Sequence, residues 1–289
     1  MPVEVIESYL ESKTGHSSGG EDRLVLGPEY YAVIDGATDK RGKNWGTRKN
    51  KLTGGQVLAD IVCDTLSSKK APLDPIKLMK QINVRINKAA DKAGINLTNV
   101  MNRADVAFAA FVPKQNAVYH IHDCTFAFVK PNKPFDVHSN EKLVDALTSE
   151  LRACVLSFLW QNGIHAISGK EDMGRGFILP MLKAQPKLQN IDADDEERWF
   201  GIPKGLLAYR TLNGMPTTIS VTPVPEDVSE IVLASDGFKD IRPTLAESLK
   251  LLKDQQRLDP CCIGPLKGTK HVKGKYFDDI SYLRIKLNA

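Results

Sequence analysis

The sequence predicts an α+β fold in which strands and helices form separate groups along the chain. Apolar runs with β-branched residues occur at 31–36, 231–237 and 277–285, and runs of this kind predict buried strands. Amphipathic helical stripes occupy the stretches between these groups. Because strands and helices do not alternate one by one, the pattern favours α+β over a parallel sheet with crossover helices.

The predicted elements follow one another from the first strands onward. Residues 53–67 carry apolar side chains at helical spacing, and Thr53 is a suitable N-cap. A second helix is predicted at 75–93 because its apolar residues fall on one face. The remaining predicted elements are strands at 105–112, 116–122, 125–130, 205–211, 217–222, 230–235 and 280–287, and helices at 141–160, 173–183 and 243–252.

The middle of the chain, residues 131–203, is predicted to be an elaborated helical segment within a single domain that spans residues 1–289. Gly163 and Gly169 interrupt it, and the acidic run 192–197 is predicted to be a solvated loop or a helix start. All the proposed ligands described below lie outside this segment. We therefore expect the segment to choose the substrate, since loops on a rigid scaffold usually carry specificity.

Composition excludes several classes of function. The chain has 39 basic and 35 acidic residues, so net charge does not indicate a nucleic-acid partner. Its start is acidic and lacks a signal peptide, and no apolar run is long enough to span a membrane. The five cysteines, an odd number without a Cys-x-x-Cys motif, favour a reducing compartment. We expect a cytoplasmic protein with no membrane partner.

Acidic residues stand at the ends of the predicted core strands. An ordinary turn explains any one Asp-Gly pair, because Asp bonds its own backbone and Gly accepts a positive φ. Repetition at the same kind of boundary is harder to explain in this way, and converging carboxylates suit a hard cation such as Mg²⁺ or Mn²⁺. The pairs are Glu21-Asp22, Asp35-Gly36, Asp236-Gly237 and Asp278-Asp279.

The order of these motifs resembles the metal-dependent protein phosphatase family, the type 2C serine/threonine phosphatases, in a divergent, bacterial-like form. Glu-Asp, Ile-Asp-Gly, Ala-Ser-Asp-Gly and Asp-Asp-Ile-Ser follow one another between residues 21 and 281, and 233–237 is the most specific match. A weaker match at 104–125 is similar to two hairpin strands that end in Gly-Asp-Ser. The resemblance implies a four-layer α-β-β-α sandwich of two antiparallel sheets flanked by helices, with metals at one end.

The resemblance also implies a role for each acidic residue. Asp35 would bridge two Mn²⁺ or Mg²⁺ ions, and the Gly36 carbonyl would bind one of them. Asp236 and Asp278 would complete the coordination of the other ion. Asp35, Asp236 and Asp278 are therefore the catalytic candidates. The remaining implied ligands are Glu21 and Asp22, which act through water, and Asp123, which with Asp236 matches a third metal position.

Two positions depart from the family pattern. Ala37 stands where eukaryotic members have a His proposed as general acid, and Ser17 stands where many members have a phosphate-binding Arg. A basic loop between Lys40 and Lys51 leaves the strand that carries Asp35, and it could hold a phosphate or an acidic peptide. Its substrate-binding candidates are Arg41 and Lys43.

The predicted reaction is hydrolysis of phosphate monoesters, chiefly phosphoserine and phosphothreonine in a protein substrate, by a hydroxide that bridges two metals. A small-molecule phosphoester hydrolase is one alternative. Another is a phosphatase-like regulatory binding module of weak or no activity, which Ala37 and Ser17 favour and the intact carboxylates oppose. His120 and His122 invite a zinc-hydrolase interpretation, but no further His follows, and two strand histidines near a turn are the favoured interpretation.

Overall fold

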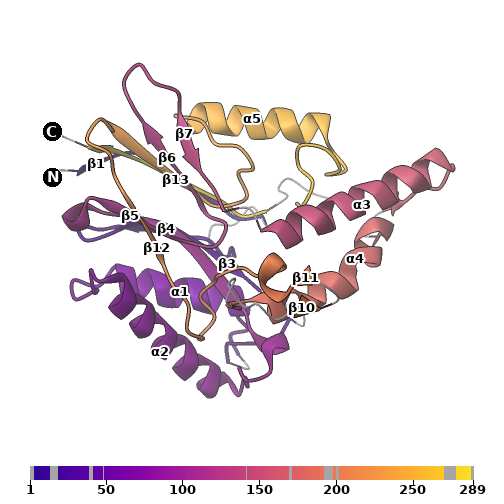
Figure 1. The fold of residues 1–289 in the computed structure, drawn as a ribbon, viewed down its shortest axis with the longest axis horizontal. Helices are drawn as coiled ribbons and strands as arrows, with labels where there is room; N and C mark the ends of the chain where they lie inside the picture. Colours follow the sequence, from indigo (N-terminus) through magenta and orange to yellow (C-terminus); the bar gives the residue numbers. More distant parts are fainter. Residues whose placement is uncertain are drawn as a thin grey trace.

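Two five-stranded antiparallel sheets lie face to face with helices on both outer sides (Figure 1). This is the predicted α+β sandwich of four layers. The computed structural model describes residues 3–13, 19–38, 42–47, 49–140, 142–168, 171–191, 198–199, 202–269 and 278–287. Within these ranges, no helix combines the length and the apolar character that crossing a membrane requires.

Each sheet joins segments that are far apart in the sequence. The first has the order β12-β5-β4-β3-β2, made of Ser220–Pro223, Ala117–Ile121, Asp105–Val112, Tyr31–Ala37 and Arg23–Leu26. The second has the order β1-β14-β13-β6-β7, made of Val3–Glu11, Ile280–Leu287, Glu230–Ala234, Thr125–Val129 and Asp136–His138. The chain passes from one sheet to the other directly between β5 and β6.

Local signals explain where the outer helices begin. Helix α1, Gly54–Leu66, starts after the N-cap Thr53, which forms a reciprocal capping box with Gln56. Helix α2, Pro75–Ala93, starts with Pro75 at its first position, where a missing N–H costs nothing, and ends at Gly94 in the left-handed conformation. Helix α5, Leu245–Leu258, repeats the capping box with Thr244.

Three apolar clusters fill the spaces between the four layers. The first packs α1 and α2 onto β3 and β4, and the third packs α5 onto β13 and β14. The second lies between the sheets, where Phe111 and Phe128 are almost fully buried. Burial of a side chain of this size contributes about 1.5–3 kcal/mol, so these layers supply most of the stabilising free energy.

The predicted helical segment forms a pair of helices that extends from the end of the sandwich (Figure 1). Helix α3, Leu143–Gln161, packs along α4, Met173–Ala184. Buried Arg152 of α3 donates to Asp172 Oδ2 from Nε and Nη2 at 2.9 and 2.7 Å, and from Nη1 to the Cys262 carbonyl at 2.6 Å. The acidic run 192–197 and Gly169 lie outside the described residues.

Short elements complete the described structure. Two small hairpins pair β8 with β9 and β10 with β11. The short strands are Ile167–Ser168, Glu171–Asp172, Arg198–Trp199 and Ile202–Pro203, and the 3-10 helices are Val100–Asn102, Pro113–Gln115, Gln185–Leu188 and Lys204–Leu207.

The strand predicted at 205–211 is wrong. Its backbone is bonded by side chains of the preceding segment, because Asn190 Oδ1 accepts from the Thr211 N–H at 2.9 Å and Asn190 Nδ2 donates to the Thr211 carbonyl at 3.1 Å. The strand predicted from 217 starts only at Ser220. In addition, β1 had not been predicted, although its alternating apolar and charged residues are typical of a half-exposed strand.

The Asp-Gly turn predicted at the end of the first apolar run is also wrong. Strand β3 continues through Asp35 and Gly36 to Ala37, in register with β4. Gly36 does not have a positive φ. It is required instead by a close approach, because a Cβ there would lie 2.3 Å from the Gly55 carbonyl oxygen of α1.

Candidate functional site

Acidic residues from both sheets meet at one end of the sandwich. Asp22 precedes β2 and Asp35 lies near the end of β3, while pairing of Arg23 with Ile34 brings these two positions together. In the second sheet, pairing of Ala234 with Thr125 brings Asp236 close to Asp123. Pairing of Ala234 with Tyr282 brings Asp236 close to Asp278. The register therefore gathers the predicted acidic residues at a single edge, the acidic rim, which comprises Asp22, Asp35, Asp123, Asp236 and Asp278.

Asp35 has a strongly perturbed carboxyl group. Burial raises its pKa well above the ordinary value, and the charges of Asp22, Asp236, Asp123 and Asp278 raise it further. The four other members of the acidic rim are thus near enough to act on Asp35 electrostatically. A cluster that repels itself in this way gains stability from a cation or from protons.

Asp22 is held at the junction of the two sheets. Its Oδ2 accepts from the Ser281 hydroxyl of β14 at 2.7 Å, whereas its Oδ1 is buried without a hydrogen-bond partner among the described residues. Burial raises the pKa of Asp22 to about 7, in spite of hydrogen bonds from Ser235 and Ser281. A buried, unpaired carboxylate oxygen is a costly arrangement unless a ligand or proton satisfies it.

Lys13 supplies a positive charge beside the acidic rim. Its Nζ lies 3.2 Å from Glu21 Oε2, 3.5 Å from Asp278 Oδ1 and 3.2 Å from Asp279 Oδ2. Burial and the charge of Asp236 raise the pKa of Asp278 to about 6, while Lys13 opposes this effect. No sequence pattern points to this contact, since 265 positions separate Lys13 from Asp278.

Glu21 is bonded on every side by protein groups. Its carboxylate accepts from the Thr38 hydroxyl, from the Thr53 hydroxyl at 2.5 Å and from Lys13. Its backbone N–H donates to Asp279 Oδ2 at 3.0 Å. Sequence reasoning had treated Asp279 only as a neighbour of Asp278, and the structure shows that it positions the Glu21-Asp22 segment against β14.

Asp123 lies in the crossover turn between the sheets and pairs with two basic groups. His122 Nδ1 is 2.5 Å from Asp123 Oδ1, and Lys142 Nζ is 2.9 Å from Asp123 Oδ2. Burial alone would raise the pKa of Asp123, but the charges of His122 and Lys142 hold it well below its usual range. His120 is instead a core residue, with Nε2 2.6 Å from the Cys124 carbonyl, as the favoured interpretation predicted.

The donor set of the acidic rim suits a hard divalent cation, because all its side-chain donors are carboxylate oxygens and one of them lacks a partner. Within the described residues, however, no group of three or more His, Cys, Asp or Glu side chains is placed so that it could hold a metal ion. The chemistry of these residues fits Mn²⁺ or Mg²⁺, and the individual ligand roles stay predictions.

The predicted phosphate-binding residues are only partly described. Arg41 and Ser17 lie outside the described residues, and Lys43 lies half-buried in the loop between β3 and α1. A residue that the sequence did not point to, Lys239, has an exposed side chain close to the acidic rim. Desolvation would lower the pKa of Lys239, but the charges of Asp236, Asp123 and Asp278 raise it.

Comparisons with known proteins give structural matches only. No protein-family profile matches the chain, and no curated protein matches it by sequence. Among solved structures, the Mycobacterium tuberculosis serine/threonine phosphatase PstP/Ppp aligns at 14% identity and a TM-score of 0.49, covering 100% of both chains. The catalytic domain of PstP in complex with two manganese ions aligns at 14% identity and 0.47, covering 99% of this chain and 97% of the other.

The Staphylococcus aureus serine/threonine phosphatase Stp1 aligns at 11% identity and a TM-score of 0.48, covering 100% of this chain and 96% of the other. Each of the three alignments covers at least 96% of both chains.

Proposed function

We propose that this protein is a metal-dependent phosphatase that hydrolyses phosphate monoesters, chiefly phosphoserine and phosphothreonine in a cytoplasmic protein substrate. The observation that supports it is the gathering of Asp22, Asp123, Asp236 and Asp278 around Asp35, whose carboxyl pKa they raise. A fold gains nothing from placing repelling carboxylates together, and arrangements of this kind are enriched at functional sites.

Asp35, Asp236 and Asp278 would hold the cation pair, with the Gly36 carbonyl, Asp22, Glu21 and Asp123 as further ligands or water contacts. Divalent cations bound there would supply the nucleophile from water and neutralise the phosphoryl charge. Manganese is the first cation to test, because one aligned phosphatase holds two manganese ions.

The chain's own basic residues would then bind the substrate phosphate. Lys239 lies near Asp236 and Asp123 and can donate to phosphoryl oxygens from the open side of the acidic rim. Lys43 and Arg41, in the loop after β3, are the second candidates. Ala37 cannot donate a proton, so the leaving group has to take one from solvent at the rim.

The test is hydrolysis of para-nitrophenyl phosphate with and without Mn²⁺ or Mg²⁺. Turnover should require the cation and stop with chelator. Asp35→Asn should lower kcat at least about 100-fold, since it removes a charge from the centre of the acidic rim. Asp240→Asn is the matched control, because Asp240 bonds Gln255 of α5 at 2.5 Å and is not among the residues that perturb Asp35.

Two results would overturn the proposal. One is undiminished turnover in chelator. The other is an Asp35→Asn variant that is folded by its thermal transition and keeps more than about a tenth of the wild-type rate, a loss of less than 1.4 kcal/mol in transition-state stabilisation.

A regulatory module without activity is the second candidate, and Lys13 is the observation that favours it. One ammonium group already contacts Glu21, Asp278 and Asp279 in the structure and offsets part of their negative charge, so the fold can satisfy part of this site without a metal. Tight Mn²⁺ binding without turnover of any phosphorylated peptide would identify this function.

A further inference from the structure

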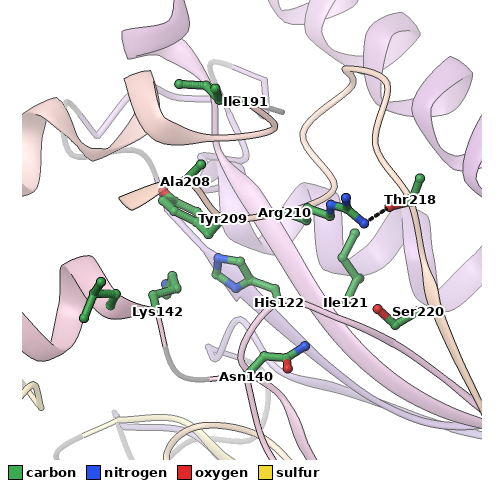
Figure 2. A pocket seen from close by; sticks show the side chains of 11 residues that line it. Ile121, His122, Asn140, Lys142, Ile191, Ala208, Tyr209, Arg210, Thr218 and Ser220 are labelled. Carbon is green, nitrogen blue, oxygen red and sulfur yellow. Dashed lines mark hydrogen bonds between the residues drawn. The ribbon is translucent and has the colours of Figure 1, made fainter. Parts of the chain in front are cut away.

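A polar cavity lies beside the acidic rim, where β5 ends and α3 begins. It has a volume of about 300 Å³, and residues of β5, β12, the start of α3 and the segment 208–210 line it (Figure 2). None of its lining residues carries a carboxylate. The chemical roles proposed above use none of these residues.

His122 forms the inner wall of this cavity (Figure 2). Strand β5 ends at Ile121, and His122 follows with a φ of 71°, a left-handed conformation that is uncommon for a residue with a Cβ. Its Nδ1 is fixed by Asp123, whereas its buried Nε2 has no hydrogen-bond partner among the described residues. Asp105 Oδ2 lies 3.9 Å from Nε2, which is too far for a hydrogen bond. Nε2 is thus available to a ligand.

Hydrogen-bond donors and positive charge surround that imidazole. Arg210 donates to the Thr218 hydroxyl and has no carboxylate partner within the described part of the chain. Lys142 Nζ lies 5.1 Å from the centre of the Tyr209 ring and is balanced by Asp123 and Asp145, both at 2.9 Å. Arg210 therefore supplies the unbalanced positive charge of the cavity.

The lining of the cavity also includes the apolar side chains of Leu143 and Ile191. We propose that it binds a compact molecule that carries an oxyanion, a phosphate or a carboxylate, on a small apolar body. Arg210 holds the anionic group, and Leu143 and Ile191 contact the apolar body. His122 Nδ1 donates its proton to Asp123, so Nε2 accepts a hydrogen bond from a protonated oxygen of the ligand. A guanidinium without a carboxylate partner among the described residues is well suited to bidentate recognition of such oxyanions.

The proposed ligand would lie next to the acidic rim without entering it. His122 and Lys142 contact the cavity on one side and Asp123 on the other. Binding in the cavity does not require the chain to be a phosphatase, so it can be tested without cations.

The experiment is titration calorimetry of the full chain with phenylphosphonate in the presence of chelator. The probe has an aromatic body and a C–P bond that a phosphatase cannot hydrolyse. Arg210→Gln and His122→Asn should each weaken binding at least about tenfold, because each removes a hydrogen bond to a charged group. Asn is chosen because it tolerates the left-handed conformation at position 122.

Arg257→Gln is the matched control, since this Arg lies at the exposed end of α5 and should leave the affinity unchanged. Asp35→Asn should also leave it unchanged. No binding at millimolar probe, or equal affinity in Arg210→Gln and His122→Asn variants with wild-type thermal transitions, would overturn the proposal. A large change in Asp35→Asn alone would place the probe at the acidic rim and overturn it as well.

Discussion

Replacing Lys13 by Met should tighten Mn²⁺ binding. Met keeps much of the length of the side chain and removes the ammonium that lies 3.2 Å from Glu21, 3.5 Å from Asp278 and 3.2 Å from Asp279. In the wild type, a cation that binds the acidic rim is repelled by this charge or has to displace it. The variant removes that competition and leaves the carboxylates without a counter-charge.

The size of the effect on Mn²⁺ affinity follows from the exposure of the Lys13 side chain. The Lys13 side chain is 37% exposed, so solvent screens each contact and each is worth about 1 kcal/mol at most. The three contacts together set a range of about 1–3 kcal/mol, and 1.4 kcal/mol corresponds to a tenfold change in dissociation constant. We expect Mn²⁺ affinity to rise about 5- to 100-fold, while the metal-free variant loses a similar amount of stability.

The assay is calorimetric titration of Mn²⁺ together with thermal unfolding in chelator. Lys114→Met is the control, because Lys114 forms a single surface pair with Glu29 at 2.8 Å and lies outside the acidic rim. Unchanged or weaker Mn²⁺ binding in Lys13→Met would refute the reasoning, since it would mean that Lys13 does not share carboxylates with the cation.

Other predictions test stability and specificity. Arg152→Met should destabilise the fold by about 3–5 kcal/mol, seen as a lower urea midpoint, because it leaves Asp172, which is only 10% exposed, without its counter-charge. In chelator, thermal stability should fall as pH rises from 5 to 8. The pKa values of Asp22 and Asp278 in the folded state, about 7 and about 6, exceed the unfolded value of 3.8. The folded state therefore binds more protons than the unfolded state, and it loses these protons and their stabilising effect in this pH range. The lowered pKa of His120 acts in the opposite direction, and a stability that rises across this range would contradict the carboxylate account. Replacing 143–184 by a short linker should spare aryl phosphate hydrolysis and impair a phosphopeptide, and equal loss on both would show that the segment builds the site itself.

The sequence predicted the fold well wherever the signal was local. The capping residue Thr53 and the helix-starting Pro75 set the boundaries of α1 and α2, and both act within one turn of the chain. The strand predicted at 205–211 failed because the backbone of Leu188 and Asn190 and the side chain of Asn190 bond to this segment, and propensity carries no record of such partners.

The candidate site was predicted in part for a similar reason. A strand boundary next to Asp35, Asp236 or Asp278 is visible in the sequence, and antiparallel register brings such boundaries to one rim. The contacts of Lys13 and the cavity at His122 depend on the packing of distant segments, so neither has a pattern in the sequence.

The carboxylates of the acidic rim come from both sheets, so a bound cation would affect how the two sheets are held together. Asp22 and Asp35 belong to one sheet, whereas Asp236 and Asp278 belong to the other, and an apolar cluster fills the space between the two layers. A cation bound by both pairs would crosslink the two layers without a covalent bond. Removal of the cation would then allow one sheet to move relative to the other, while each sheet kept its own backbone hydrogen bonds. Amide hydrogen exchange would measure that difference strand by strand.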